Sequence, residues 1–345
     1  MNDDIKLVFD ALEHTELAKR VEDYKVIVKC PVCGEGTKRH NHSHCYVGLI
    51  NNGPPVVFHC FMNECSGVVN PNFLHDMGIF DNELDTILNI FNRSISNLDK
   101  ISRRIYMITK KKEHMSIPKI VDNGNSMHKL TYMCNRLGIK FSYENLESLK
   151  VVFSLKDFLE VNDIQPNMKY KGFNKVINND YVGFLSSNND YIVFRNTVNN
   201  DNLRYVKYDL FNSMDTGNII YNVPGMQCDL FADEVNLNIC EGPFDALGLF
   251  CHVKKYDKVN NIYAACCGSG YLNAIKYFIK LGFINNLRVN IYSDSDKDLK
   301  YYRKIKIYDQ IEPWVKSIDI YYNELSKDYG VPAREIMVTR AKRGS

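Results

Sequence analysis

The sequence lacks a long apolar run and lacks a large net charge. None of its hydrophobic stretches approaches the ~18 residues that a membrane-spanning helix needs, and the first ten residues, MNDDIKLVFD, are acidic, so we expect neither a transmembrane span nor a signal peptide. A net charge of +2 excludes a global field that would draw the whole chain to nucleic acid. Without an export signal, the eleven cysteines of this 345-residue chain predict a reducing cytoplasm and metal binding, not a disulfide scaffold.

The composition changes along the chain, which contains no internal repeat and no low-complexity tract. Residues 1–80 hold five of the eleven cysteines and predict a zinc-ribbon domain. Residues 81–117 predict a helix and a linker. The helix is DNELDTILNIFN, at 81–92, with apolar residues at helical spacing, and the next 20 residues carry seven basic side chains and one acidic one.

The remainder predicts a body of two subdomains, so the expected fold class is multidomain, α+β and α/β. Residues 118–232 contain a helical pattern and then alternating, β-rich stretches at 181–211, which indicate a mixed or antiparallel sheet. Residues 233–345 alternate between strands and helices, with VNLNIC, NIYAAC, LRVNIYS and SIDIYY as the strands. Such alternation is typical of a parallel sheet covered by helices.

Four cysteines form two short pairs with the outline C-x2-C-x26-C-x4-C: Cys30 and Cys33, then Cys60 and Cys65. Two thiolates in a C-x2-C knuckle can bind one tetrahedral zinc ion, and a second pair closes the site. The segment HCYVGLINNGPPVVFHC predicts a hairpin, and two knuckles on hairpins make a zinc ribbon. A closed four-cysteine site is structural, because it leaves no open position for a substrate.

Other side chains that can bind metal lie between the two pairs: His40, His42, His44, Cys45 and His59. The stretch RHNHSHC favours an exposed loop, although a substitute zinc ligand within it remains an alternative. His59 adjoins Cys60 and would point to the opposite face of a strand.

Acidic side chains follow two of the predicted parallel strands. Glu241 stands at the carboxyl end of VNLNIC, before Gly242 and a helix that carries Asp245. Asp294 and Asp296 follow LRVNIYS, and residues i and i+2 of a strand point the same way. Ligands bind at the carboxyl ends of strands in open α/β sheets, and Mg²⁺ prefers oxygen ligands. We therefore expect Glu241, Asp294 and Asp296 to bind Mg²⁺ or Mn²⁺.

Two further aspartates admit more than one interpretation. Asp245 could extend the metal-binding set. Asp298 could be another ligand or the N-terminal charge of the next helix. DSDKD by itself could be a solvated acidic turn, but its combination with E-G-x-x-D and with GSG at 268–270 favours a metal site for phosphoryl transfer.

Three of these motifs together resemble the Toprim fold that DnaG-type primases and topoisomerases share: EGPFD at 241–245, GSG at 268–270 and DSDKD at 294–298. A zinc ribbon ahead of such a segment is similar to the DnaG-type DNA primases in particular. LTYMCNRLGIKFSYENL resembles the start of their polymerase core, and LSKDYGVP, which includes Asp328, resembles their Lys-Asp motif. The chain departs from the family in having Lys297-Asp298 where Ala-Gly is usual, and in ending without a helicase region. This lean design resembles a phage primase.

The resemblance implies RNA primer synthesis on single-stranded DNA, a nucleotidyl transfer in which Glu241, Asp294 and Asp296 hold the catalytic metal. It implies ribonucleoside triphosphates as substrates, a separate replicative helicase as partner, no membrane, and a host's cytoplasm if a phage encodes the chain. Each expected cation for phosphate and template contacts could instead be an ordinary surface charge. These cations are Arg136, Arg195, Arg204 and Lys207.

Two other classes of protein remain alternatives. The first is another Toprim enzyme, a topoisomerase or a nuclease, although 345 residues leave little room for a DNA gate beside a zinc ribbon. The second is a zinc-ribbon protein without catalysis that binds single-stranded DNA or mediates recombination. Retention of Glu241, Asp294 and Asp296 disfavours the second class.

Overall fold

The computed structural model describes residues 2–34, 43–50, 53–60, 65–93, 115–198, 203–211, 219–224, 228–252 and 260–341. The chain forms two compact units. The first comprises Met1–Lys111, Asp229–Glu234 and Lys276–Leu287, and the second comprises Lys112–Cys228, Val235–Ile275 and Arg288–Ser345. None of the described helices combines the length and the apolar character that crossing a bilayer requires.

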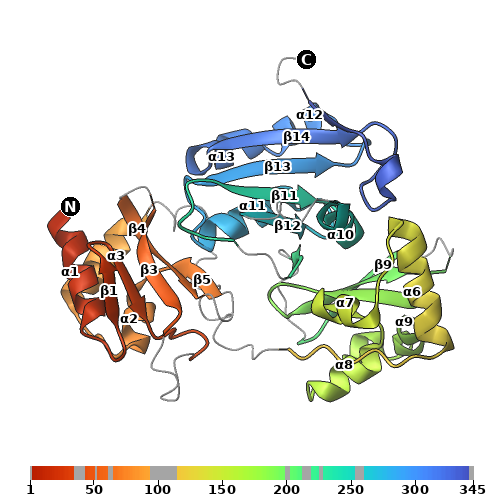
Figure 1. Ribbon diagram of the computed structural model, residues 1–345, viewed down its shortest axis with the longest axis horizontal. Coiled ribbons are helices and arrows are strands. Elements are labelled where there is room, and N and C mark those ends of the chain that lie inside the picture. The colour runs from red at the N-terminus through yellow and green to blue at the C-terminus, as the bar shows by residue number, and fades with distance from the viewer. Residues whose placement is uncertain are drawn as a thin grey trace. The chain divides into compact units, whose positions relative to one another are not determined.

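The first unit is built on a sheet with the strand order β1-β2-β3-β4-β5, in which every neighbouring pair is antiparallel (Figure 1). Its strands are β1 (Lys19–Glu22), β2 (Lys25–Val28), β3 (Cys45–Ile50), β4 (Gly53–Cys60) and β5 (Cys65–Val68). Its helices include α1 (Asn2–Glu13), α2 (Pro71–Asp76) and α3 (Asn82–Phe91). The hairpin predicted from the segment between the cysteine pairs is confirmed as β3 and β4.

The helices of the first unit pack their apolar faces onto the sheet. Phe9 of α1, Val47 of β3 and Leu88 of α3 are fully buried in one shared core. The predicted helix at 81–92 is confirmed as α3, which begins after Asp81, whose carboxylate accepts hydrogen bonds from the backbone of Glu83 and Leu84. Most of the predicted basic linker, residues 94–114, lies outside the described residues.

The second unit contains an antiparallel sheet with the order β6-β7-β8-β9, as the alternating pattern at 181–211 predicts. Its strands are β6 (Val151–Val152), β7 (Tyr181–Leu185), β8 (Tyr191–Asn196) and β9 (Tyr205–Asp209). Its helices include α6 (Gly124–Leu137), α7 (Tyr143–Ser148), α8 (Leu155–Val161) and α9 (Asn174–Asp180). A capping box of Asn123 and Ser126 begins α6, and Gly138, with a φ of 65°, ends it.

The second unit also contains a larger sheet with the order β10-β12-β11-β13-β14-β15. Its strands are β10 (Tyr221–Asn222), β11 (Val235–Cys240), β12 (Asn261–Ala265), β13 (Leu287–Ser293), β14 (Ser317–Asn323) and β15 (Val338–Arg340). The helices that connect them are α10 (Pro243–His252), α11 (Tyr271–Lys280), α12 (Leu299–Lys304) and α13 (Ile307–Ile311). The part of α11 from Lys276 onward belongs to the first unit. The pairs β11–β12 and β13–β14 are parallel, and β10 and β15 add antiparallel edges.

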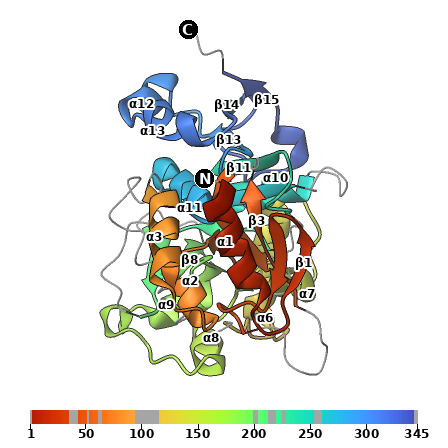
Figure 2. The same ribbon diagram turned by 90° about the vertical axis from the view of Figure 1, so that its left-hand side faces the viewer.

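The strand order of this sheet reverses between β11 and β13. The chain passes from β11 outward to β12 and then returns across β11 to β13, which lies on the other side. Because parallel crossovers are right-handed, this reversal sends the connecting helices to opposite faces. Figure 2 shows α10 on one side of the strands and α12 and α13 on the other. The carboxyl ends of β11 and β13 therefore flank a topological switch point, the place where open α/β sheets bind ligands.

Candidate active site and zinc centre

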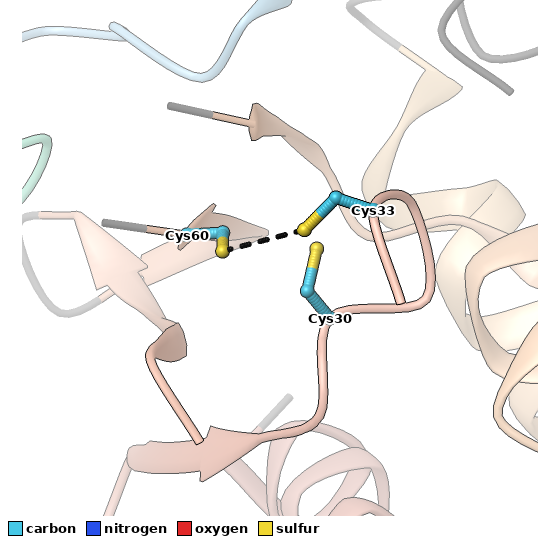
Figure 3. Close-up of side chains that lie close together, drawn as sticks. All are labelled: Cys30, Cys33 and Cys60. Carbon is cyan, nitrogen blue, oxygen red and sulfur yellow. Dashed lines mark hydrogen bonds between the residues drawn. The ribbon is translucent and has the colours of Figure 1, made fainter. Parts of the chain in front are cut away.

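Three of the predicted zinc ligands come together in the first unit. The Sγ atoms of Cys30, Cys33 and Cys60 lie within 4.8 Å of one another, and Cys30 and Cys60 are buried (Figure 3). The Cys33 and Cys60 sulfurs are 3.7 Å apart. Four zinc–sulfur bonds of about 2.3 Å in a tetrahedron place two sulfurs about 3.8 Å apart. The trio therefore fits one face of a tetrahedral zinc site.

The fourth position of the zinc site is not fixed by the described side chains. The backbone of Cys65 pairs directly with that of Cys60, but the Cys65 side chain lies outside the described residues. Cys45 pairs with Cys60 from the other neighbouring strand and is fully buried, yet within the described part of the chain it is not a member of the sulfur trio. Cys65 thus stays the predicted fourth ligand.

The structure describes two of the four histidines in this region, His44 and His59. His59 turns away from the sulfurs, since its Nδ1 is 2.7 Å from Oγ of Ser66, and burial lowers its pKa to about 4. This is the orientation that strand alternation predicts. His44 is described and half-buried, whereas the predictions for His40 and His42 lie outside the described residues.

The turn after β11 presents Glu241 at the carboxyl end of the sheet. Its carboxylate accepts an ion-paired hydrogen bond from Nζ of Lys297, and its backbone oxygen accepts from the N–H of Gly268, at 3.1 Å. Lys297 belongs to the turn after β13, where its own N–H donates to the carbonyl of Asp294, at 3.1 Å. The structure therefore brings the three sequence motifs at 241–245, 268–270 and 294–298 to one rim.

Asp245 is buried beneath that rim and holds the loops in place. Its Oδ2 accepts from the N–H of Gly242, at 3.0 Å, and its Oδ1 accepts from the N–H groups of Tyr329 and Gly330, at 3.2 and 2.7 Å. Burial raises the pKa of Asp245 to about 6, and the neighbouring Asp328 adds to this effect. With its oxygens committed to backbone donors, Asp245 fixes the two loops.

Asp294 lies among other carboxylates. Burial raises its pKa to about 7, and Asp245, Asp328 and Asp296 act in the same direction through like-charge repulsion. The nearby ammonium of Lys327 lowers the pKa and offsets part of this effect. The ionised form of a carboxylate that is partly buried among other carboxylates is stabilised by a nearby cation. These oxygen ligands therefore fit a hard divalent metal.

The carboxylates of the rim are not drawn tightly together. Among the Asp, Glu, His and Cys side chains that the structure describes, only the cysteine trio brings three ligand atoms within 4.8 Å of one another. Asp296 is exposed and pairs with Lys327 at 2.8 Å. Asp298 caps α12, since its Oδ1 accepts from the N–H of Tyr301 at 3.0 Å. The structure thus shows the helix-terminus arrangement for Asp298.

Arg136, one of the predicted cations, reaches from α6 of the antiparallel subdomain to the same rim. Its guanidinium lies 4.7 Å from the ring centre of Phe244, donates to the hydroxyl of Tyr132 at 3.2 Å, and is 3.6 Å from the carboxylate of Asp328. Arg136 therefore joins the two subdomains through an acidic residue that is itself coupled to Asp294.

Strands β8 and β9 supply the other predicted cations. Arg195 is only 7% exposed, stacks on the ring of Tyr205 at 4.6 Å, and among the described residues its Nε and Nη1 have no hydrogen-bond partner. A Cβ placed on Gly242 would lie 3.5 Å from the Tyr205 hydroxyl, so β9 reaches the Glu241 turn. Buried guanidinium N–H groups without partners are costly, and a bound anion would satisfy them.

Lys207 and Arg204 occupy exposed positions on or beside β9. A Cβ placed on Gly268 would lie 3.4 Å from Nζ of Lys207, which puts this ammonium beside the glycine loop of the rim. Gly268 has a φ of 140°, so only glycine suits this backbone. Arg204 is exposed and immediately precedes β9. Among the described residues it forms no ion pair with an acidic side chain.

Sequence reasoning assigned no role to four residues of the rim. They are Tyr132, Lys297, Lys327 and Asp328. The signal for the lysines was present in the motifs themselves, because Lys297 stands inside the acidic run DSDKD and Lys327 belongs to the segment LSKDYGVP that resembles a Lys-Asp motif. Tyr132 carried no such signal, since tyrosine is common throughout this chain.

A separate cavity of about 400 Å³ lies between α8 and α9. Its lining includes Leu155, Leu159, Ile164 and Pro166, together with Lys156 and Glu160. None of the predicted site residues lines it.

The fold and site define an α/β protein with a trio of cysteines that fits a zinc ion and an acidic rim on a partly parallel sheet. No protein-family model matches the sequence, and no curated protein matches it. Among solved structures, the zinc-binding and RNA polymerase domains of the primase of Aquifex aeolicus align over 94% of this chain and 78% of that chain, with 12% identity and a TM-score of 0.36.

Proposed function

We propose that this chain is a DnaG-type DNA primase that makes RNA primers on single-stranded DNA. In this proposal the larger sheet of the second unit is a Toprim subdomain, the antiparallel sheet belongs to the primase core, and the first unit is a zinc ribbon. In this proposal the primase is a phage-like member of its family. The zinc ribbon would be structural, held by Cys30, Cys33, Cys60 and Cys65.

One observation carries the proposal. Glu241 and Asp294 directly follow the adjacent strands β11 and β13, on either side of the switch point, and the Lys297–Glu241 pair ties their turns together. Acidic side chains at a switch point are suited to binding a metal-bound phosphate, because that crevice is where the sheet opens to ligands. The sequence motifs that resemble Toprim enzymes are the same residues.

The cations of β8 and β9 support a polyphosphate as the substrate group. Lys207 lies beside Gly268, and Arg195 has two buried nitrogens without a partner among the described residues. In the proposed reaction these groups would hold the triphosphate, since a guanidinium binds phosphate oxygens with paired hydrogen bonds. The exposed ring of Tyr205 would stack on a base of the single-stranded template.

The proposed chemistry is nucleotidyl transfer. The 3′-oxygen of one ribonucleotide forms a bond to the α-phosphorus of the next, and the bond to pyrophosphate breaks. Mg²⁺ or Mn²⁺ bound by Glu241, Asp294 and Asp296 would neutralise the charge that develops on the phosphates. Asp245 would keep the Glu241 turn and the 329–330 loop in register through its three backbone hydrogen bonds.

The test is incorporation of labelled ribonucleotides on single-stranded DNA in the presence of Mg²⁺. The parent chain is expected to make short RNA, Asp294→Asn to make none, and Lys207→Gln to need a higher nucleotide concentration because a phosphate contact is lost. Asp309→Asn, an exposed aspartate of α13, is the matched control and should behave as the parent. Template-dependent RNA synthesis that survives in Asp294→Asn would contradict the proposal, and cleavage of supercoiled DNA without synthesis would favour a topoisomerase or nuclease.

A further inference from the structure

Lys297 occupies a position in the rim that a surface lysine would not. It stands in the turn after β13, between Asp294 and the helix cap Asp298, and its side chain is only 16% exposed. Its ammonium bonds to Oε2 of Glu241 and lies 5.9 Å from the ring centre of Tyr271, which is itself fully buried. Lys327, by contrast, pairs with Asp296 while both side chains are more than half exposed. Exposed pairs of that kind contribute little, whereas Lys297 is a fixed internal charge.

The Lys297 ammonium uses an oxygen that a metal would need. An ammonium held on Oε2 of Glu241 and a divalent cation bound to the same oxygen would repel each other strongly, so the two cations compete for this carboxylate. The rim also fails to draw three carboxylate oxygens together among the described residues, as a ready metal site would. Glu241 is turned toward lysine, and Asp294 is left with other carboxylates around it.

Resting on the proposed function, we propose that Lys297 is a built-in counter-ion that competes with divalent metal for Glu241. In the metal-free protein its ammonium holds Glu241 and steadies the turn after β13 against the repulsion of the acidic residues. A divalent cation binds the rim only by displacing the ammonium from Glu241. Lys297 thereby raises the concentration of divalent metal that is needed to occupy the rim.

The first test is a titration with Mg²⁺ alone, without nucleotide or DNA, followed by calorimetry or by the rise in melting temperature, with zinc retained. Lys297→Met is expected to bind Mg²⁺ at least about tenfold more tightly than the parent, a factor that corresponds to about 1.4 kcal/mol. Lys297→Arg keeps the charge and should stay within about threefold of the parent. Lys300→Met, an exposed lysine of α12, is the matched control and should be unchanged.

A second test uses the unmodified chain, so that it does not depend on the folding of a variant. Acetylation of lysines by a small reagent, read by peptide mass spectrometry, should rise severalfold at Lys297 when saturating Mg²⁺ is added and should stay constant at Lys300. Mg²⁺ binding by Lys297→Met that is equal to or weaker than the parent's, or Lys297 reactivity that does not rise with Mg²⁺, overturns the proposal. If the parent shows no saturable Mg²⁺ binding and makes no primer, the proposed function has failed. If the parent does both but Lys297→Met binds no more tightly, only the role of Lys297 has failed.

Discussion

Replacing Asp294 by asparagine should make the metal-free protein more stable while abolishing the proposed synthesis of RNA primers. Asp294 has a pKa of about 7 in the folded protein, against 3.8 ordinarily, because it is partly buried among other carboxylates. A pKa difference of about 3 corresponds to about 4 kcal/mol, since each pKa unit is about 1.4 kcal/mol. Asp294 is partly open to solvent, so screening reduces the expected penalty to about 2 kcal/mol.

The sign of the pH dependence follows from proton binding. Between pH 4 and pH 7 the folded protein keeps a proton on Asp294 that the unfolded chain has lost, so the free energy of unfolding falls as the pH rises through this range. Above pH 7 the full penalty is present. Asparagine has nearly the same shape and no charge, so Asp294→Asn should be more stable than the parent at pH 8 and similar to it at pH 4.

The assay is thermal unfolding at pH 8 in buffer without Mg²⁺, with zinc left in place and no chelator added. For a domain of roughly 200 residues, ~2 kcal/mol corresponds to a rise of about 4–8 °C in melting temperature. Added Mg²⁺ should then raise the melting temperature of the parent and leave Asp294→Asn unchanged. A variant that melts at or below the parent at pH 8, with the same difference at pH 5, would refute the reasoning.

Three other changes probe separate parts of the molecule. Cys33→Ser should lose bound zinc, measured by metal analysis, because it removes one sulfur of the trio, whereas Cys251→Ser should keep it. Burial lowers the pKa of Lys129 to about 8, so between pH 8 and 10.5 the folded protein binds fewer protons than the unfolded chain. The free energy of unfolding of the parent should therefore rise by up to about 3 kcal/mol over this range. Lys129→Met should flatten that rise. Asp298→Asn should keep both stability and Mg²⁺ response, since asparagine caps a helix as well as aspartate does.

Each of these expectations has a contrary outcome that is simple to observe. Retention of one zinc per chain by Cys33→Ser would exclude Cys33 as a ligand. An unchanged slope of stability against pH in Lys129→Met, beside the exposed control Lys140→Met, would show that Lys129 does not titrate in that window. Loss of the Mg²⁺ response in Asp298→Asn would make Asp298 a ligand as well as a helix cap.

The strands and helices near the site followed from the sequence because their patterns are local. The predicted strand VNLNIC coincides with β11, and LRVNIYS coincides with β13. Apolar alternation and helical spacing depend on burial of one face, which neighbouring residues encode. The cysteine pairs could also be identified from the sequence, since the short spacing within a C-x2-C knuckle is a local pattern.

Strand order and side-chain pairing came only from the tertiary structure. The sequence placed Glu241 and Asp294 at strand ends but could not say that β11 and β13 are neighbours, because pairing between strands depends on chain crossovers and not on local pattern. Nor could it show that Asp245 serves backbone N–H groups, that Arg136 meets Asp328, or that Lys297 bonds to Glu241. Charge type is written in the sequence, but the environment that decides what a charge does is made by residues far away along the chain, brought together by folding.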